Sequence, residues 1–338
     1  MVDLRIHHRT AYRYRCPVGL GPHRLMLRPR ESRDLRLVSS HLTVTPDATV
    51  RRAYDVAGNA VATATLITPA EELVIDSVAR VELFATAYPV FEIAAAAGAF
   101  PFRYSDDEWT DLGALTLRQY PGEDDLRAWT QDFVAGCPTD TLSLPKDINA
   151  GAGNIFHQAR EDEDTQSPSQ TLSWVLGSCR DLATLFIEAV RSLGFGARLV
   201  SGDLHDPTRT LLGSADAGST HAWAEVYLPG AGWITFVPTN RAMGGANLIP
   251  VAVVRDIRQA MPVSGSFIGP ADALLEMSVA VRVVERGARR GSSPWRLRRS
   301  MRAEAERRPY MFRQSVKPEC FASSVNPAAA SRSSATIT

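Results

Sequence analysis

The first 84 residues carry the pattern of β-strands, and this pattern limits the fold more than any other feature of the sequence. Residues 4–14 divide into two faces with a period of two, which predicts a strand with one buried face. Pro17 and Gly19 are expected to end this strand. Because further candidate strands follow closely, we predict an N-terminal β-sandwich over residues 1–84. These strands cover residues 24–27, 35–44, 50–56, 60–67 and 73–83.

Residues 85–285 contain both predicted helices and predicted strands, although residues 84–125 show little usable period. The clearest helix follows Ser178, with Asp181 placed as in a capping box and Gly194 and Gly196 as its end. Its predicted buried stripe consists of Leu182, Leu185, Phe186, Ala189, Val190 and Leu193. Other helices are expected near residues 124–135 and 147–160, and strands over residues 198–201, 222–228, 233–237 and 278–284.

Residues 286–338 differ in composition from the rest of the chain. Arginines crowd residues 286–308, and the remainder is rich in Ser and Ala, which predicts a disordered tail. A basic tail could contact RNA or an acidic partner, but an unstructured, solvated tail is the favoured interpretation. Since the formal net charge of the whole chain is +0, nucleic acid is not an expected partner.

The cysteines suggest a reduced protein without a metal centre. Cys16, Cys137, Cys179 and Cys320 form no C-x-x-C pair, so neither a zinc site nor a disulfide framework is expected. Asp203, His205 and Asp206 could imitate a metal site, but a loop with solvated polar groups is favoured. We therefore expect no metal and no cofactor. The start is too polar for a signal peptide and no apolar run reaches membrane length, so a cytoplasmic, non-membrane protein is expected.

Cys179 and His221 are the candidate catalytic residues. Cys179 falls in the first turn of the capped helix, where free N–H groups and the helix dipole favour a thiolate. His221 opens a predicted strand, and its ordinary pKa near neutrality suits a general base. Taken alone, Cys179 would more often be a buried apolar residue, and His221 beside Trp223 a packed residue of the sheet. The surrounding motifs favour the catalytic interpretation.

Those motifs are Gly177-Ser-Cys-Arg-Asp181, His221-Ala-Trp-Ala-Glu-Val-Tyr227 and Trp233-Ile-Thr-Phe-Val-Pro-Thr-Asn240. In this order they resemble the transglutaminase-like cysteine enzymes of bacteria. The resemblance extends over residues 1–284 and includes an N-terminal region like that family's own. It implies a papain-like core of the α+β class after the β-sandwich, with Cys179 as nucleophile and His221 as base. It also implies acyl transfer or hydrolysis of peptide or isopeptide amides through a thioester.

One position departs from the family pattern. Val237 stands where the family has the aspartate that orients the histidine, and valine accepts no hydrogen bond. Asn240 is the nearest polar substitute, and a regular hairpin around residues 229–232 would bring it opposite His221. A turn role for Asn240 is the more common alternative. Impaired catalysis is therefore expected, and the alternative is an inactive protein of the same fold used for binding or assembly.

Overall fold

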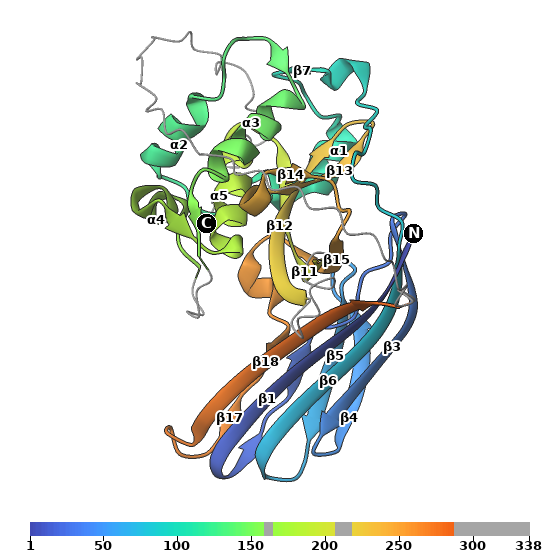
Figure 1. Cartoon of the computed structure of the whole chain (residues 1–338). Helices are drawn as coiled ribbons and strands as arrows, with labels where there is room; N and C mark the ends of the chain where they lie inside the picture. Colours follow the sequence, from blue (N-terminus) through green and yellow to red (C-terminus); the bar gives the residue numbers. More distant parts are fainter. Residues whose placement is uncertain (159–164, 207–217, 287–338) are drawn as a thin grey trace, which may run out of the picture. The chain divides into compact units, whose positions relative to one another are not determined.

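Two antiparallel sheets make up the N-terminal part of the chain in the computed structural model, which describes residues 1–158, 165–206 and 218–286. Both sheets contribute to one apolar core that includes Tyr14, Leu25, Ala64 and Ile75, so the predicted β-sandwich is confirmed. Figure 1 shows β18, β1, β6 and β3 side by side. The first sheet holds β1 (Val2–Leu20), β3 (Leu35–Thr45), β6 (Ala70–Leu83), β17 (Phe267–Ile268) and β18 (Leu274–Glu285), and the second holds β2 (His23–Leu25), β4 (Ala48–Tyr54), β5 (Ala60–Leu66) and β16 (Val263–Ser264).

Strand β1 follows the predicted alternation but runs further than expected. Leu4 and Ile6 are buried, whereas Arg5 is exposed. The expectation that Pro17 and Gly19 end the strand is wrong, because β1 continues to Leu20. The register between β1 and β6 shifts between Arg13 and Val18, so the proline falls where the regular ladder is interrupted and its missing N–H costs little.

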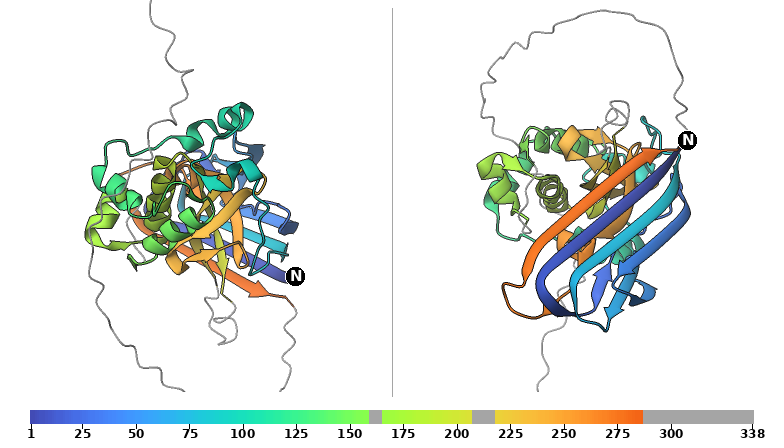
Figure 2. Two further views of the ribbon diagram at one scale, coloured as in Figure 1. Left: turned by 90° about the horizontal axis from the view of Figure 1, so that it is seen from above. Right: turned by 60° about the horizontal axis from the view of Figure 1, so that its bottom comes forward.

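The last described strand returns to the first sheet. β18 pairs antiparallel with β1 from Leu4↔Glu285 to Tyr14↔Leu274, and the right-hand view of Figure 2 shows the two strands along each other. Residues Met1–Arg286 form one compact unit. The predicted domain boundaries therefore stay a prediction, with domains at 1–84, 85–285 and 286–338. The predicted tail lies outside the described residues apart from Arg286.

A second five-stranded sheet and its helices form the α+β core. The sheet has the order β14-β13-β12-β11-β15, and α5 (Cys179–Ser192) packs on β11 and β12. Leu182, Leu185 and Phe186 of α5 are fully buried in a cluster with Ala224 and Phe236, as the predicted stripe requires. The strands are β11 (Gly196–His205), β12 (Gly218–Leu228), β13 (Gly232–Val237), β14 (Ala242–Met243) and β15 (Leu248–Val254).

Shorter elements connect these layers. The helix expected at 147–160 begins earlier, as α3 (Ser143–Ala152), and stops at Gly153. No helix among the described residues has the length and hydropathy needed to cross a bilayer. The other helices are α1 (Asp106–Leu112), α2 (Asp124–Gln131), α4 (Pro168–Trp174), η1 (Ala95–Ala97), η2 (Gly113–Thr116), η3 (Pro238–Asn240) and η4 (Ile257–Ala260), and the other strands are β7 (Ala99–Phe100), β8 (Thr139–Asp140), β9 (Phe156–His157) and β10 (Leu176–Gly177).

Candidate functional site

Cys179 is the first residue of α5, and a buried carboxylate fixes the turn before it. Asp181 Oδ2 accepts hydrogen bonds from Ser178 N at 2.8 Å and Ser178 Oγ at 2.7 Å. Asp181 Oδ1 accepts a further bond from Gln166 N at 2.8 Å. Asp181 is fully buried, so these bonds are not in competition with water. The capping pattern in the sequence therefore positions the candidate nucleophile.

Burial and nearby backbone N–H groups have opposite effects on the pKa of the Cys179 thiol. Burial raises the pKa of the thiol above its ordinary value, although the backbone N–H groups of Ala222 and Arg180 lie against Sγ and lower it. The N–H groups at the helix start therefore act on the thiol in the expected direction, but the loss of hydration outweighs their effect on its pKa. The contact with Ala222 nonetheless brings Sγ beside the residue that follows His221.

His221 lies near the start of β12 and is largely buried. Its ring stacks on that of Trp223, with centroids 6.2 Å apart and an interplanar angle of 26°. Burial, with a smaller contribution from the nearby His157, lowers the pKa of His221 to about 4. The imidazole is thus neutral at physiological pH. A neutral imidazole can accept a proton, which is the state that a general base requires.

Thr239 lies within hydrogen-bond distance of the His221 ring, and the sequence analysis did not identify this residue. Leu228 pairs with Gly232, and this register continues to Ala224↔Phe236, so Thr239 falls opposite His221. Thr239 Oγ1 lies 3.3 Å from His221 Nε2. The expected position of Asn240 opposite His221 is therefore wrong by one residue.

Asn240 has a local role instead. Its Oδ1 accepts the N–H of Ala242 at 3.1 Å within the turn that follows η3. This bond closes the tight connection between β13 and β14 and occupies the amide oxygen that would have faced the imidazole. The structure therefore favours the turn role that the sequence left open for Asn240.

Val237 lies on β13 in an apolar environment. It is 2% exposed and packs in a cluster with Val200, Trp223, Leu248 and Val253. The site of the family's aspartate is consequently occupied by a well-packed aliphatic side chain. No hydrogen bond to the imidazole can come from this position.

Strand β10 ends two residues before Cys179 and pairs with the short strand β9. His157 pairs with Gly177 in parallel, and its effect on the pKa of His221 indicates that the two rings are near each other. Phe156, Trp174 and Val175 are exposed here, and Val175 adopts a left-handed φ of 52°. A β-branched residue rarely adopts this conformation, and such strain is concentrated at functional sites. Nothing in the sequence singled out His157 or Val175.

The polar cluster near residue 203 is placed differently from the expectation. Asp203 and His205 belong to β11 and are buried, so the predicted loop with solvated groups is wrong. Burial raises the pKa of Asp203 to about 7 and lowers that of His205. Within the part of the chain that the structure describes, no group of three or more His, Cys, Asp or Glu side chains is arranged to hold a metal ion.

The chain thus has a papain-like α+β core preceded by a β-sandwich, and in this core Cys179 lies beside Ala222, the residue that follows His221. Residues 4–82 match the bacterial transglutaminase-like N-terminal region, and residues 127–238 match the transglutaminase-like superfamily. The chain therefore combines an N-terminal region of the bacterial transglutaminase-like type with a transglutaminase-like core, as its motifs indicated.

Several proteins match this chain over most of their own length. An uncharacterized protein of Mycobacterium leprae is 24% identical over 299 residues, covering 83% of this chain and 99% of its own. One of Mycobacterium bovis is 26% identical over 296 residues, covering 82% of this chain and 91% of its own. A crystal structure from Cytophaga hutchinsonii, assigned to the cysteine proteases, superposes with a TM-score of 0.64 at 18% identity, covering 85% of this chain and 92% of that one. At this identity the superposition establishes the fold.

Proposed function

We propose that this protein is a cysteine-dependent hydrolase or acyltransferase that acts on amide or isopeptide bonds of peptides or proteins. Cys179 is the nucleophile and His221 is the general base. One observation carries the proposal: Cys179 begins α5 with its Sγ against the N–H of Ala222, the residue that follows His221. The cysteine-protease assignment of the Cytophaga hutchinsonii protein supports peptides as the substrate class.

The reaction begins from a neutral pair. Because the pKa of Cys179 is raised and that of His221 is about 4, the proton leaves the thiol as the sulfur attacks. The Sγ–C bond forms, and the proton moves from Sγ to the imidazole. The C–N bond of the amide then breaks, the imidazole returns the proton to the leaving amine, and a thioester remains on Cys179. Water releases an acid from this thioester, and an amine releases a new amide.

Thr239 is the positioning residue for His221 in this proposal. Its hydroxyl accepts the Nε2–H of the imidazole across the 3.3 Å contact, which leaves Nδ1 as the basic nitrogen. A neutral hydroxyl stabilises the imidazolium less than a carboxylate does. The rate is therefore expected to be lower than that of a relative with an aspartate.

The test is amide hydrolysis by the full chain on a peptide panel. Cys179→Ala is expected to abolish turnover. Thr239→Val should lower kcat about tenfold, because one neutral hydrogen bond to the base is lost, whereas Thr239→Ser should retain the rate. Asn240→Ala is the matched control for the turn and should change kcat less than about threefold if its bond only closes that turn. A large loss with Asn240→Ala and none with Thr239→Val would transfer the orienting role to Asn240.

The second candidate is an inactive protein of the same fold that binds or assembles with others. The observation that favours it is the aliphatic packing of Val237 at the position of the family's aspartate. In that case the folded wild type and Cys179→Ala would show the same absence of turnover on every peptide, and no thioester would form.

We further propose that the protein works in a reducing compartment, the cytoplasm. Cys16, Cys137 and Cys179 all carry free thiols, as expected where disulfides are kept reduced. Non-reducing mass spectrometry of the protein from its native cells would reveal any disulfide. A disulfide involving Cys179 would exclude this compartment for the active form.

A further inference from the structure

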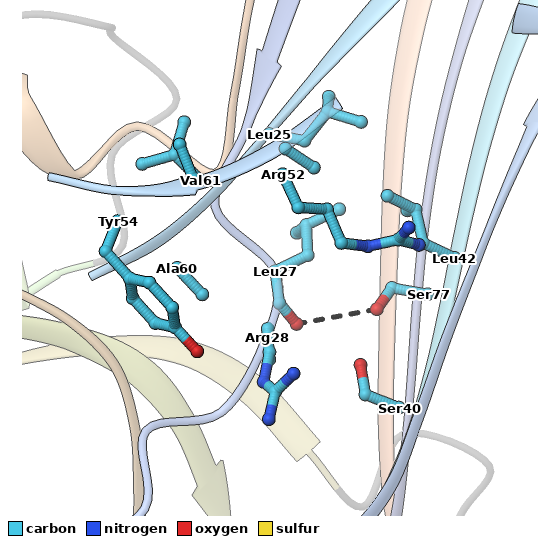
Figure 3. A pocket seen from close by; sticks show the side chains of 12 residues that line it. Leu25, Leu27, Arg28, Ser40, Leu42, Arg52, Tyr54, Ala60, Val61 and Ser77 are labelled. Carbon is cyan, nitrogen blue, oxygen red and sulfur yellow. Dashed lines mark hydrogen bonds between the residues drawn. The ribbon is translucent and has the colours of Figure 1, made fainter. Parts of the chain in front are cut away.

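A cavity of about 210 Å³ opens between the two sheets of the N-terminal sandwich. Figure 3 shows its inner wall of Leu25, Leu27, Leu42 and Val61. These side chains come from both sheets, so the cavity is a place where the sandwich core does not close. None of its lining residues belongs to the Cys179 site. An apolar cavity of about 150 Å³ is enough to hold benzene, so this one has room for a small apolar body.

Two arginines flank this apolar wall. Arg52 reaches into the cavity from β4, and Arg28 lies below it in the same view. Among the described residues, no carboxylate lies within ion-pair distance of Arg52, and Arg28 has only Glu31, at 3.9 Å. Positive charge beside an apolar cavity is therefore left largely uncompensated by the protein itself.

Hydroxyl groups complete the polar side of the cavity. Ser40 and Tyr54 line it, and Ser77 donates a hydrogen bond to Leu27 O at 3.4 Å across its inner end. Guanidinium and hydroxyl groups both donate to carboxylate oxygens, and arginine does so with two parallel bonds. The polar groups thus match a carboxylate head group, and the apolar wall matches an aliphatic chain.

We propose that this cavity binds a small monocarboxylate with an apolar chain, such as a medium-chain fatty acid. The chain lies against Leu25, Leu27 and Leu42, and the carboxylate binds Arg52 and Arg28 at the rim. The charge of the arginines argues for an acid over a neutral lipid, because a carboxylate would form charge-assisted bonds with Arg52, which has no ion-pair partner among the described residues, and with Arg28, whose only such partner is Glu31 at 3.9 Å. The site is separate from the Cys179 chemistry and does not depend on it.

The test is calorimetric titration of the full-length protein with octanoate, with octanamide as the uncharged analogue and acetate as the analogue without a chain. Octanoate is expected to bind at one site, at least about tenfold more tightly than octanamide, because charge-assisted bonds to arginine are lost with the amide. Acetate should show no measurable binding, since it lacks the apolar chain. Affinity should fall as salt is raised.

Arg51 and Arg52 provide a matched pair of variants, since they are neighbours on β4 and only Arg52 lines the cavity. Arg52→Gln should weaken octanoate binding at least about tenfold, whereas Arg51→Gln and Cys179→Ala should leave it unchanged. Leu42→Ser tests the apolar wall and should weaken binding as well. Equal binding of octanoate and octanamide, equal effects of the two arginine variants, or no binding of octanoate to the folded protein would overturn the proposal.

Discussion

At the scale of single residues, the His221 ring depends on which side chain stands opposite it. The motifs in the sequence were enough to propose Cys179 and His221 as the catalytic pair, because the order of the blocks is specific. They could not identify Thr239, since its position follows from the closure of the β12–β13 hairpin at Leu228↔Gly232. A shift of one residue in that loop would have brought Asn240 opposite the ring instead.

Val237→Asp is predicted to raise kcat about 10²-fold if the site is otherwise competent, part of the penalty for a missing orienting carboxylate. Position 237 is diagonal to His221 on the sheet, within reach of a carboxylate. The new charge raises the pKa of His221 from about 4. Since protonated His221 cannot act as a base, the fall of kcat/KM on the acid side of the profile should move to higher pH. The measurement is the pH–rate profile of both proteins. Because the carboxylate enters an apolar cluster, a loss of about 1–3 kcal/mol in stability should accompany the gain.

Asp203→Asn is predicted to stabilise the protein, and more so at higher pH. The pKa of Asp203 is about 7 in the folded protein and near its ordinary value when unfolded, so the wild type loses stability as pH rises between these values. The uncharged variant escapes this loss. Its advantage in urea unfolding should be roughly 2–3 kcal/mol larger at pH 8 than at pH 5. Asp147→Asn, at an exposed position, is the control, and equal pH dependence of all three proteins would refute the prediction.

At the scale of elements, α5 is held by more than its apolar stripe. Glu188 and Arg191 form a fully buried ion pair at 2.8 Å on this helix. Glu188 also accepts the N–H groups of Gln119 and Tyr120, and Arg191 donates to Ala197 O. The pair thus ties the helix to the loop before α2 and to β11. The sequence predicted the stripe from its period, but charged residues at this spacing are usually exposed, so their burial could not be predicted.

Glu188→Ala is predicted to cost about 3–5 kcal/mol in the free energy of unfolding, because it leaves Arg191 buried without its counterion. The double variant Glu188→Met/Arg191→Met should be distinctly more stable than the single one, since no unpaired charge remains. Denaturant unfolding of the three proteins measures both. A loss below about 1 kcal/mol for Glu188→Ala would mean that water reaches the arginine.

Other elements show how far a periodic pattern can be trusted. Apart from β1, the strands expected in residues 1–84 lie close to their observed bounds. The start of α3 was missed, since Leu142 provides no side-chain cap to mark it. Pro17 was taken as the end of β1 because the sequence does not reveal an irregularity in strand pairing.

At the scale of the whole molecule, the first and last described strands are paired with each other. The partnership of β1 and β18 could not be predicted, since residues 260 to 281 positions apart in the sequence carry no local signal of their contact. Val281 and Val283 of β18 join Leu4 and Ile6 in one buried cluster. The N-terminal sheet is therefore completed by residues from the end of the predicted core.

Two valines of β18 test this arrangement. Val283 is fully buried and Val279 is 49% exposed, although both lie on the same strand. Val283→Thr is predicted to cost about 1–3 kcal/mol through burial of a hydroxyl group, and Val279→Thr less than about 0.5 kcal/mol. A chain ending at Ala273 should lose the cooperative unfolding of the sandwich that a chain ending at Arg286 retains. Equal effects of the two substitutions would contradict the pairing of β18 with β1.

The most direct measurement of the central claim is the detection of the acyl-enzyme. The full-length protein is mixed with an activated acyl ester at neutral pH, quenched in acid, digested and mapped by mass spectrometry. The predicted result is a thioester on Cys179, formed much more slowly in His221→Gln, with no comparable acylation of Cys16, Cys137 or Cys320. Acylation of the other cysteines at the same rate, or labelling of Cys179 that is unchanged in His221→Gln, would contradict a catalytic pair at this site.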